Sequence, residues 1–467
     1  MKDVTGFAAH SIKKKRQNYF LPVFVGLLVC VVVGGSAVES EAGQKADSMR
    51  YWPQWRGPEG NGVAPLADPP VQWSEGENVR WKIALPGTGH ATPIVWGERI
   101  YVTIAIQGEA VASAAVEEEP QGEGRRRRRG VQPDQTLKFA LLAIDRKDGR
   151  IAWQRIVREE KPHEGHHPDA AWVSNSSVTD GQHIYAYFGS RGLYCFDMEG
   201  QLKWEKDLGD MQTRRGFGEG SSPALHGNTL VINWDHQGPS FIVALDKTTG
   251  AEKWRSGRDE ETSWSTPFVV EHKGRPQIVT SATNKVRSYD LETGEIIWES
   301  QGMTVNVIPS PVASGDLIFV MSGFRGSALQ AIRLPAAQGN IADSDAVVWS
   351  YSQDTPYVPS PLLYGDALYF LKGNKGILSC LNAQTGEVHY GPQRLADVAN
   401  VYASPVGANG RVYLAGRDGN VLVFKGGPEF AVLATNSLED GFDASPVAVD
   451  GELYLRGRQF LYCIAAN

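Results

Sequence analysis

The chain has 467 residues, with 46 Lys or Arg against 53 Asp or Glu and a formal net charge of −7. A mildly acidic chain is not a generic nucleic-acid binder, so we expect no specific nucleic-acid partner. Its four cysteines have neither zinc-ligand spacing nor the C-x-x-C-H pattern of haem attachment.

Residues 1–42 have the composition of a secretory signal peptide. Four consecutive cations at positions 13–16 precede an apolar run from about 19 to 35, and small residues at 37 and 42 are candidates for cleavage. The run is shorter than the roughly 20 residues of a comfortable membrane span, and an uncleaved anchor is the alternative. No other stretch approaches that length. We therefore expect an exported protein of the periplasm or cell envelope, with no transmembrane span in the mature chain.

Residues 43–72 form a lead-in rich in Pro, Gly and Trp. We expect Trp52 and Trp55 to lie against an end or a side of the domain that follows, because large aromatic side chains gain most from burial. A ligand-binding platform is the alternative.

Residues 73–467 repeat one unit. Each copy opens with a short strand, a Gly-containing turn and an alternating strand, and most copies then carry an apolar strand, an Asp, a second turn and an aromatic residue, as in 244–254. The openings lie at Pro93, Ser177, Pro223, Pro267, Pro311, Pro361, Pro405 and Pro446. A spacing of about 45 residues is the period of propeller blades. The eight openings predict one all-β domain, an eight-bladed β-propeller of four-stranded antiparallel blades.

Closure of the ring follows from an incomplete last unit. That unit ends without an aromatic fourth strand, and an unpaired strand around Trp81 precedes the first unit. We expect this N-terminal strand to complete the last blade, which removes a bare sheet edge. The aromatic residues expected to pack one blade against the next are Trp81, Trp153, Trp204, Trp254, Trp298, Trp349 and Tyr390.

Residues 107–136 interrupt the first unit between its second and third strands. This stretch is of low complexity, with an acidic cluster followed by five arginines, and is expected to be disordered. The corresponding turn carries a cation in most other units: Arg191, Lys285, Arg325, Lys375, Arg417, Arg456 and Arg458. Because such turns share one face of a propeller, we expect a positive rim that favours an anionic partner. Simple solvation of exposed turns is the alternative.

The loop between the first and second units should lie on that same face. It contains His163, His166, His167 and Asp169, residue types that bind metals at short spacing. Pro168 and the lack of helical or strand periodicity argue against a preformed cage, so we expect a surface loop and no metal.

No catalytic motif stands out. The chain has no G-x-S-x-G, P-loop, H-E-x-x-H or dinucleotide fingerprint, and Ser221 and Ser222 belong to a repeat opening. The recurring aspartates Asp145, Asp197, Asp246 and Asp290 suit turn capping, since a catalytic carboxylate would occur once.

The repeat A-x-D-x-x-T-G-x-x-x-W, seen at 244–254 and approximately at 289–298, resembles the quinoprotein repeat of dehydrogenases that depend on pyrroloquinoline quinone (PQQ). It is also similar to the repeat of the BamB family of outer-membrane assembly lipoproteins, which have the fold without the cofactor. The likeness extends over about 73–465, and the segment WPQWRGP at 52–58 resembles exported PQQ-like propeller proteins.

This resemblance implies two functions. One is a non-catalytic envelope module that binds a protein or an anionic polymer through one face, which we favour together with a monomeric state and no cofactor. The alternative is a PQQ- and Ca²⁺-dependent oxidoreductase acting on an alcohol or sugar. Those dehydrogenases typically carry an adjacent Cys–Cys pair that this chain lacks, although the soluble sugar-oxidising type lacks it too.

Overall fold

The structure is a computed structural model that describes residues 47–108 and 130–466. The predicted signal peptide lies outside the described residues, as does most of the 107–136 insertion. In the described part of the chain, no helix has the length and apolar character needed to cross a membrane.

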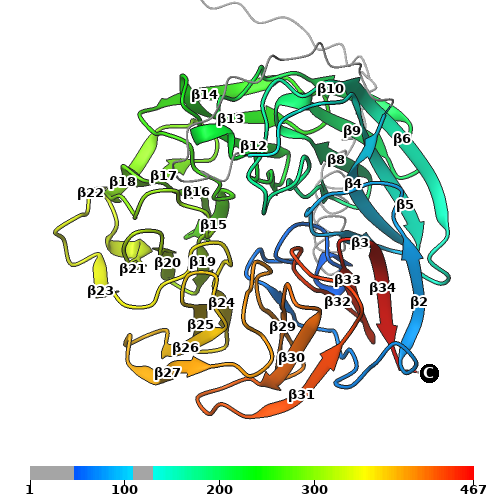
Figure 1. Ribbon diagram of the computed structural model, residues 1–467. Coiled ribbons are helices and arrows are strands. Elements are labelled where there is room, and N and C mark those ends of the chain that lie inside the picture. Colours follow the sequence, from blue (N-terminus) through cyan, green and yellow to red (C-terminus); the bar gives the residue numbers. More distant parts are fainter. Residues whose placement is uncertain (1–46, 109–129, 467) are drawn as a thin grey trace, which may run out of the picture. The chain divides into compact units, whose positions relative to one another are not determined.

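Eight antiparallel sheets surround a common axis, so the predicted propeller is confirmed (Figure 1). Blade 1 contains β3 (Ile94–Trp96), β4 (Arg99–Gln107), β5 (Leu137–Asp145) and β6 (Ile151–Glu160). Blade 2 contains β7 (Val178–Thr179), β8 (His183–Tyr187), β9 (Leu193–Asp197) and β10 (Leu202–Lys206). Blade 3 contains β11 (Ala224–His226), β12 (Thr229–Trp234), β13 (Ser240–Asp246) and β14 (Glu252–Arg258). Blade 4 contains β15 (Phe268–His272), β16 (Arg275–Ser281), β17 (Lys285–Asp290) and β18 (Ile296–Gln301).

The second half of the ring repeats this order. Blade 5 contains β19 (Val312–Ser314), β20 (Leu317–Ser322), β21 (Ala328–Arg333) and β23 (Val347–Tyr351). Blade 6 contains β24 (Leu362–Tyr364), β25 (Ala367–Leu371), β26 (Ile377–Asn382) and β27 (Val388–Arg394). Blade 7 contains β28 (Val406–Ala408), β29 (Arg411–Ala415), β30 (Asn420–Lys425) and β31 (Val432–Ser437). Blade 8 contains β32 (Val447–Val449), β33 (Glu452–Arg456), β34 (Phe460–Ala465) and, from the N-terminal side, β2 (Val79–Ala84).

The ring closes as predicted. Strand β2 pairs antiparallel with β34, with Trp81 opposite Cys463. The remaining short elements are β1 (Val63–Ala64), β22 (Gly339–Asn340) and the 3₁₀ turns η1 (Gly189–Arg191), η2 (Arg214–Gly216) and η3 (Leu334–Ala336). The apolar core lies between neighbouring blades, where one cluster joins blade 8 to blade 1 through Val447, Tyr454 and Val102.

A closed circle of hydrogen bonds links all eight blades near the axis. In each blade, a buried Ser or Thr lies two residues before the first strand and accepts the backbone N–H of its counterpart in the preceding blade. The bonds are 2.9–3.2 Å long and run in the order Thr92, Ser176, Ser222, Thr266, Ser310, Ser360, Ser404, Ser445 and back to Thr92. We call this circle the hydroxyl ring.

The outer strands join the blades through aromatic side chains. The indole of Trp254 lies over Gly294 in the next blade, and its Nε1–H donates to the carbonyl oxygen of Leu291 at 2.9 Å. Glycine is required there, because a Cβ at Gly294, with φ of +72°, would lie 2.4 Å from the indole. Four further Trp–Gly pairs repeat this contact: Trp81–Gly149, Trp153–Gly200, Trp204–Gly250 and Trp349–Gly386.

Two of the predicted aromatic residues lie differently. Trp298 is fully buried and hydrogen-bonds Gln277 of its own blade, while β22 pairs in parallel beside it at Gly339. Blade 5 has no T-G turn to receive the indole, and β22 covers it instead. Tyr390 packs against Phe430 of blade 7, with ring centroids 5.6 Å apart.

Candidate functional site: the two mouths of the central channel

The propeller has two unlike faces. We call the side that carries the connections between blades and the turns between second and third strands the loop face, and the opposite side the turn face. The first strand of each blade lies nearest the axis of the ring (Figure 1). The channel mouths are therefore the places where residues from different blades can meet.

The lead-in fills the channel on the side of the turn face. We call residues 52–64 the plug. Trp52 exchanges backbone hydrogen bonds with Val95 of blade 1, and the carbonyl of Pro53 accepts the N–H of Thr179 in blade 2. Farther along, β1 pairs in parallel with β28 of blade 7. The plug is thus bonded to the inner strands of blades 1, 2 and 7, which lie up to three blades apart around the ring.

Arg56 holds the plug in place from inside the channel. Its guanidinium donates to the carbonyl oxygens of Pro361 in blade 6 at 2.5 Å and Pro405 in blade 7 at 2.8 Å. The side chain is 2 % exposed. Burial lowers the pKa of Arg56 to about 9, so it stays protonated at neutral pH. Sequence reasoning placed the lead-in against the propeller but did not identify Arg56.

The loop between blades 1 and 2 crosses the other mouth. Its Asp169 accepts a hydrogen bond from Nη1 of Arg417 in blade 7 at 3.0 Å, and the Tyr402 hydroxyl lies 3.5 Å from the second carboxylate oxygen. Arg417 also stacks over the ring of Tyr402, 4.2 Å from its centroid, and Nε lies 2.6 Å from Asp443. Asp169, at the far end of this loop, is thus held on the loop face by its ion pair with Arg417.

Asp443 is the centre of a charged cluster at this mouth. Its side chain is 2 % exposed and lies 2.9 Å from Nε of Arg458 and 3.5 Å from Nε2 of His90. Burial, together with nearby arginines, lowers the pKa of His90 to about 4, although the Asp443 carboxylate acts in the opposite direction. His90 is therefore neutral at physiological pH.

The predicted cationic rim differs in the structure because most of its members are buried or paired. Arg191 is 4 % exposed and lies 2.9 Å from Glu219, while Lys285 lies 2.9 Å from Glu299. Arg417 and Arg458 bind Asp443, as described above. Arg456 is 1 % exposed and donates to the carbonyl oxygen of Ala91.

Arg325 and Lys375 remain as exposed members of the predicted rim. The carboxylates that pair with Arg191, Arg417 and Arg458 come from connections between blades, whereas Glu299, the partner of Lys285, lies in β18 of the same blade. The repeats gave no signal for those carboxylates, since each occurs once.

The histidines of the loop between blades 1 and 2 point apart. His163 hydrogen-bonds the carbonyl of Met211 at 2.7 Å, His166 packs edge-on against Trp172, and His167 packs edge-on against Phe217. Asp169 is engaged with Arg417. Within residues 47–108 and 130–466, no group of three or more His, Cys, Asp or Glu side chains is placed to hold a metal ion.

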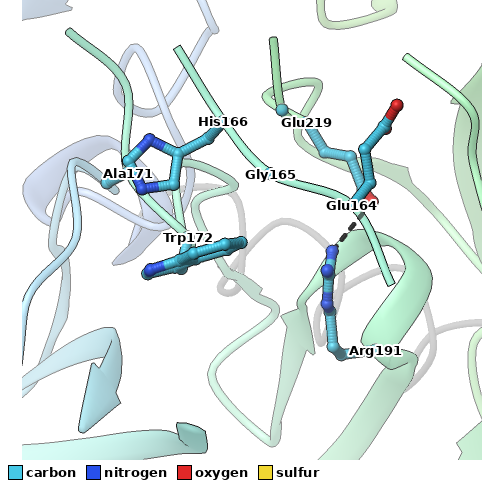
Figure 2. A pocket seen from close by; sticks show the side chains of 8 residues that line it. Glu164, Gly165, His166, Ala171, Trp172, Arg191 and Glu219 are labelled. Carbon is cyan, nitrogen blue, oxygen red and sulfur yellow. Dashed lines mark hydrogen bonds and ion pairs between the residues drawn. The ribbon is translucent and has the colours of Figure 1, made fainter. Parts of the chain in front are cut away.

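A small pocket lies beside this loop (Figure 2). His166 and Trp172 line one side, and Arg191 reaches from η1 toward Glu219 on the other. The Glu219 carboxylate also accepts bonds from the backbone and hydroxyl of Ser190 at 2.7 Å. Burial lowers the pKa of His166, so the pocket wall is neutral there. These side chains bind one another, and the pocket serves to anchor the loop.

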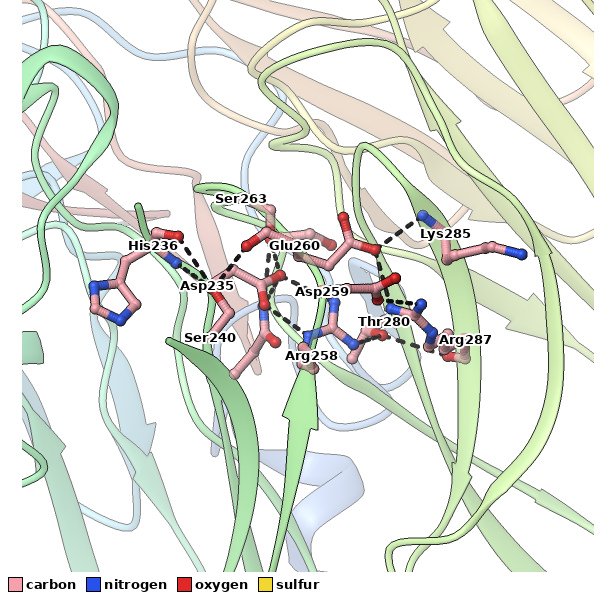
Figure 3. A network of polar contacts seen from close by, with 12 residues as sticks. Asp235, His236, Ser240, Arg258, Asp259, Glu260, Ser263, Thr280, Lys285 and Arg287 are labelled. Carbon is pink, nitrogen blue, oxygen red and sulfur yellow. Dashed lines mark hydrogen bonds and ion pairs between the residues drawn. The ribbon is translucent and has the colours of Figure 1, made fainter. Parts of the chain in front are cut away.

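A buried polar network joins blades 3 and 4 (Figure 3). The Arg258 guanidinium donates twice to Asp235, at 2.6 and 3.0 Å, and both side chains are fully buried. Arg258 also donates to Tyr289 at 2.6 Å, and the Ser263 hydroxyl donates to Asp235 at 2.6 Å. A buried bidentate pair with these further bonds is a structural lock. Sequence reasoning missed it because each member occurs in a single blade.

The three cysteines in the described part of the chain, Cys195, Cys380 and Cys463, are free and buried in third strands. Burial raises the pKa of each thiol to about 12, so none is a reactive thiolate.

A family model described as outer membrane protein assembly factor BamB matches residues 71–238 and 239–467. These ranges take in nearly all of the propeller. The chain belongs to this family.

Solved structures of BamB-like and quinoprotein propellers share its fold. BamB from Moraxella catarrhalis is 12 % identical and superposes with a TM-score of 0.50 over 77 % of this chain and 100 % of that one. Quinohemoprotein alcohol dehydrogenase from Comamonas testosteroni is 12 % identical, with a TM-score of 0.58 over 93 % and 85 %. A europium-containing methanol dehydrogenase is 12 % identical, with a TM-score of 0.58 over 89 % and 91 %. No curated protein matches the sequence.

Proposed function

We propose that this chain is a non-catalytic binding module of the cell envelope, which holds a protein partner on the loop face of its propeller. The family description names an outer-membrane assembly factor, which supports both an envelope location and a role in assembly. The predicted signal peptide at 1–42 is consistent with export.

The observation that carries this proposal is the closure of the channel from both sides. The plug, held by Arg56, occupies the side of the turn face. The loop from blade 1 reaches Arg417 in blade 7 across the other mouth. Because segments of the chain itself lie at both ends of the channel, we take the outer surfaces, including the loop face, as the places where another molecule can bind.

The residues at the loop-face mouth do not fit PQQ with calcium. Ca²⁺ takes six to eight oxygen ligands, with carboxylates prominent among them. Asp169 and Asp443, which lie at this mouth, are each already bound by Arg417, and Asp443 also by Arg458. A carboxylate neutralised by guanidinium groups is a poor ligand for a second cation. We derive no reaction through this cofactor.

A PQQ-dependent oxidoreductase is the second candidate, favoured only by the fold likeness to the two dehydrogenases. Fold alone does not carry an activity, because the chemistry of a propeller enzyme lies in residues added to the scaffold. The two candidates differ in whether the protein binds PQQ and Ca²⁺ in its central channel.

The test has two arms. In the first, purified protein is titrated with PQQ in excess Ca²⁺, and dye reduction is followed with an alcohol or a sugar. We expect neither stoichiometric uptake nor turnover, and tight uptake with turnover would refute the proposal.

In the second arm, a photo-cross-linking residue replaces exposed Gln212 on the loop face, or exposed Lys147 on the turn face, in the exported protein. We expect a defined protein adduct from position 212 and none from position 147. Equal labelling from both faces would remove the loop face as the binding surface.

A further inference from the structure

Three turns between second and third strands carry an arginine whose surroundings can be compared directly. Arg191 of blade 2 and Arg417 of blade 7 are both paired with carboxylates of the chain itself. Arg325 of blade 5 occupies the same kind of turn and is exposed. Among the described residues, no carboxylate lies within ion-pair distance of Arg325.

Arg417 is an example of such a turn arginine that is already bound by carboxylates of the chain, and we call this arrangement the filled site. Its guanidinium stacks on the ring of Tyr402 at 4.2 Å, which leaves the N–H edges free to bind. Those edges reach Asp169 at 3.0 Å and Asp443 at 2.6 Å. An aromatic ring thus supports the flat face of the arginine, while carboxylates bind its edge.

Arg325 also has an aromatic ring beside it, at a longer distance. Its guanidinium lies 5.4 Å from the ring centroid of Phe324, and Phe324 in turn stacks on Tyr357 with centroids 4.6 Å apart and planes 25° from parallel. Tyr357 belongs to the connection between blades 5 and 6, and its backbone N–H bonds Gly373 at the turn of blade 6. The column of two rings and one guanidinium is therefore fixed to two neighbouring blades.

The backbone around this column is strained. Arg325 has φ of +55° and Asn306, in the preceding connection, has φ of +58°. Residues with a Cβ pay roughly 1 kcal/mol or more for this conformation, and such strain concentrates where a side chain must be presented in one direction. Asn306 is 3 % exposed, and no hydrogen bond to its Oδ1 is found among the described residues.

We propose that Arg325, supported by Phe324 and Tyr357, is the anchor that binds a carboxylate of an acidic protein segment. This inference rests on the proposed function and names the surface and the chemistry of the partner. Exposed Lys375, on the neighbouring turn, adds a second positive charge.

The chemistry favours a carboxylate over other anions. The planar fork of N–H groups on an arginine matches the two oxygens of one carboxylate. The filled site at Arg417 takes two carboxylates, Asp169 beside Nη1 and Asp443 beside Nε. Tyrosine and arginine are also the residues that most often carry the binding energy of protein interfaces. If the Arg325 side chain is already held in its binding conformation, it loses less conformational entropy when the partner binds.

The experiment uses a fluorescein-labelled decamer of glutamate as the probe, at low salt, with anisotropy as the readout. We expect Arg325→Glu to weaken binding by about tenfold or more, since it replaces attraction by repulsion. Arg325→Lys, which keeps the charge but loses the fork, should weaken it several-fold, as should Phe324→Leu, which removes the support. The matched control is Arg150→Glu, the same charge change at an exposed turn-face residue, with binding within about twofold of the wild type.

Several results would overturn the inference. They are no binding of the probe by the wild type, equal binding by Arg325→Glu, equal binding by Arg325→Lys, or tighter binding of inorganic polyphosphate or oligogalacturonate of matched charge. The proposed function is separable from it. A loop-face adduct that persists with Arg325→Glu would refute the Arg325 anchor and leave the binding module intact, whereas PQQ uptake with turnover would refute the module itself.

Discussion

The backbone N–H of Ser445, in the last blade, donates to the hydroxyl oxygen of Thr92, in the first, at 3.2 Å. This bond joins residues 353 positions apart and completes the hydroxyl ring. Closure of the propeller therefore depends on two independent features, this bond near the axis and the pairing of β2 with β34 at the periphery.

Removing one hydroxyl from the ring should destabilise the fold. Ser404→Ala leaves the buried N–H of Ser360 without its acceptor, at an expected cost of about 1–3 kcal/mol in the free energy of unfolding. Ser404→Thr keeps the acceptor, because the hydroxyls of Thr92 and Thr266 accept the corresponding bonds elsewhere in the ring, and should cost less. Urea unfolding followed by tryptophan fluorescence measures both. Equal losses for the two variants would contradict the hydrogen-bonding role.

A Cβ added at Gly62 should displace Arg56 and weaken the attachment of the plug. Gly62 has φ of +87°, and a Cβ there would lie 2.4 Å from Nη2 of Arg56. Gly62→Ala should therefore expose residues 52–64 to faster hydrogen exchange and proteolysis. The control is Gly227→Ala, where φ is +54° but no atom lies within 4 Å of the added Cβ. Protection of the plug that is unchanged by Gly62→Ala would show that Arg56 does not hold it.

Mutations of Trp254 and Gly294, which are in contact between blades 3 and 4, should have non-additive effects on the free energy of unfolding. Gly294→Ala forces a Cβ into the indole of Trp254, and Trp254→Ala removes that indole at a cost of about 3 kcal/mol. In the double variant the added methyl no longer meets the ring, so the losses should fall short of additivity by about 1 kcal/mol or more. Unfolding free energies of the four proteins complete the cycle. Additive losses would mean that the ring and the glycine do not interact.

Acid should destabilise the loop-face mouth through His90. Its pKa is about 4 in the folded chain and ordinarily 6.5, so the unfolded chain binds the proton more tightly. The stability contributed by neutral His90 is complete above pH 6.5 and is lost as the pH falls toward 4. The loss amounts to about 2 kcal/mol at pH 5. His90→Gln should flatten the stability profile between pH 7 and 5 by that amount. An unchanged slope would assign the acid sensitivity to other groups.

The repeated features were predictable from the sequence because each occurs many times. The blade number and the closing strand at Trp81 both follow from counting copies and noticing which one is incomplete. The hydroxyl ring was visible as a Ser or Thr before most opening prolines, but its bonds join neighbouring repeats and have no local signature.

The unique contacts could not be predicted in the same way. Arg56 reaches carbonyl oxygens about 300 residues or more away, and Asp169 meets Arg417 248 positions later. Each of these contacts joins segments far apart in the sequence, and neither the period of the repeat nor the spacing of a motif indicates which residues will meet. The expected cationic rim failed at Arg191 and Arg456 for the same reason, since burial is decided by loops that differ from blade to blade.

The pairing of β2 with β34 sets an order of events during synthesis. Residues 79–84 leave the ribosome early, yet their partner strand at 460–465 is among the last to be made, and the plug likewise waits for blades 6 and 7. Until those segments have been made, β2 has no partner strand and Arg56 cannot bind the carbonyl oxygens of Pro361 and Pro405. The ring therefore cannot close until both strands of this pair have been made.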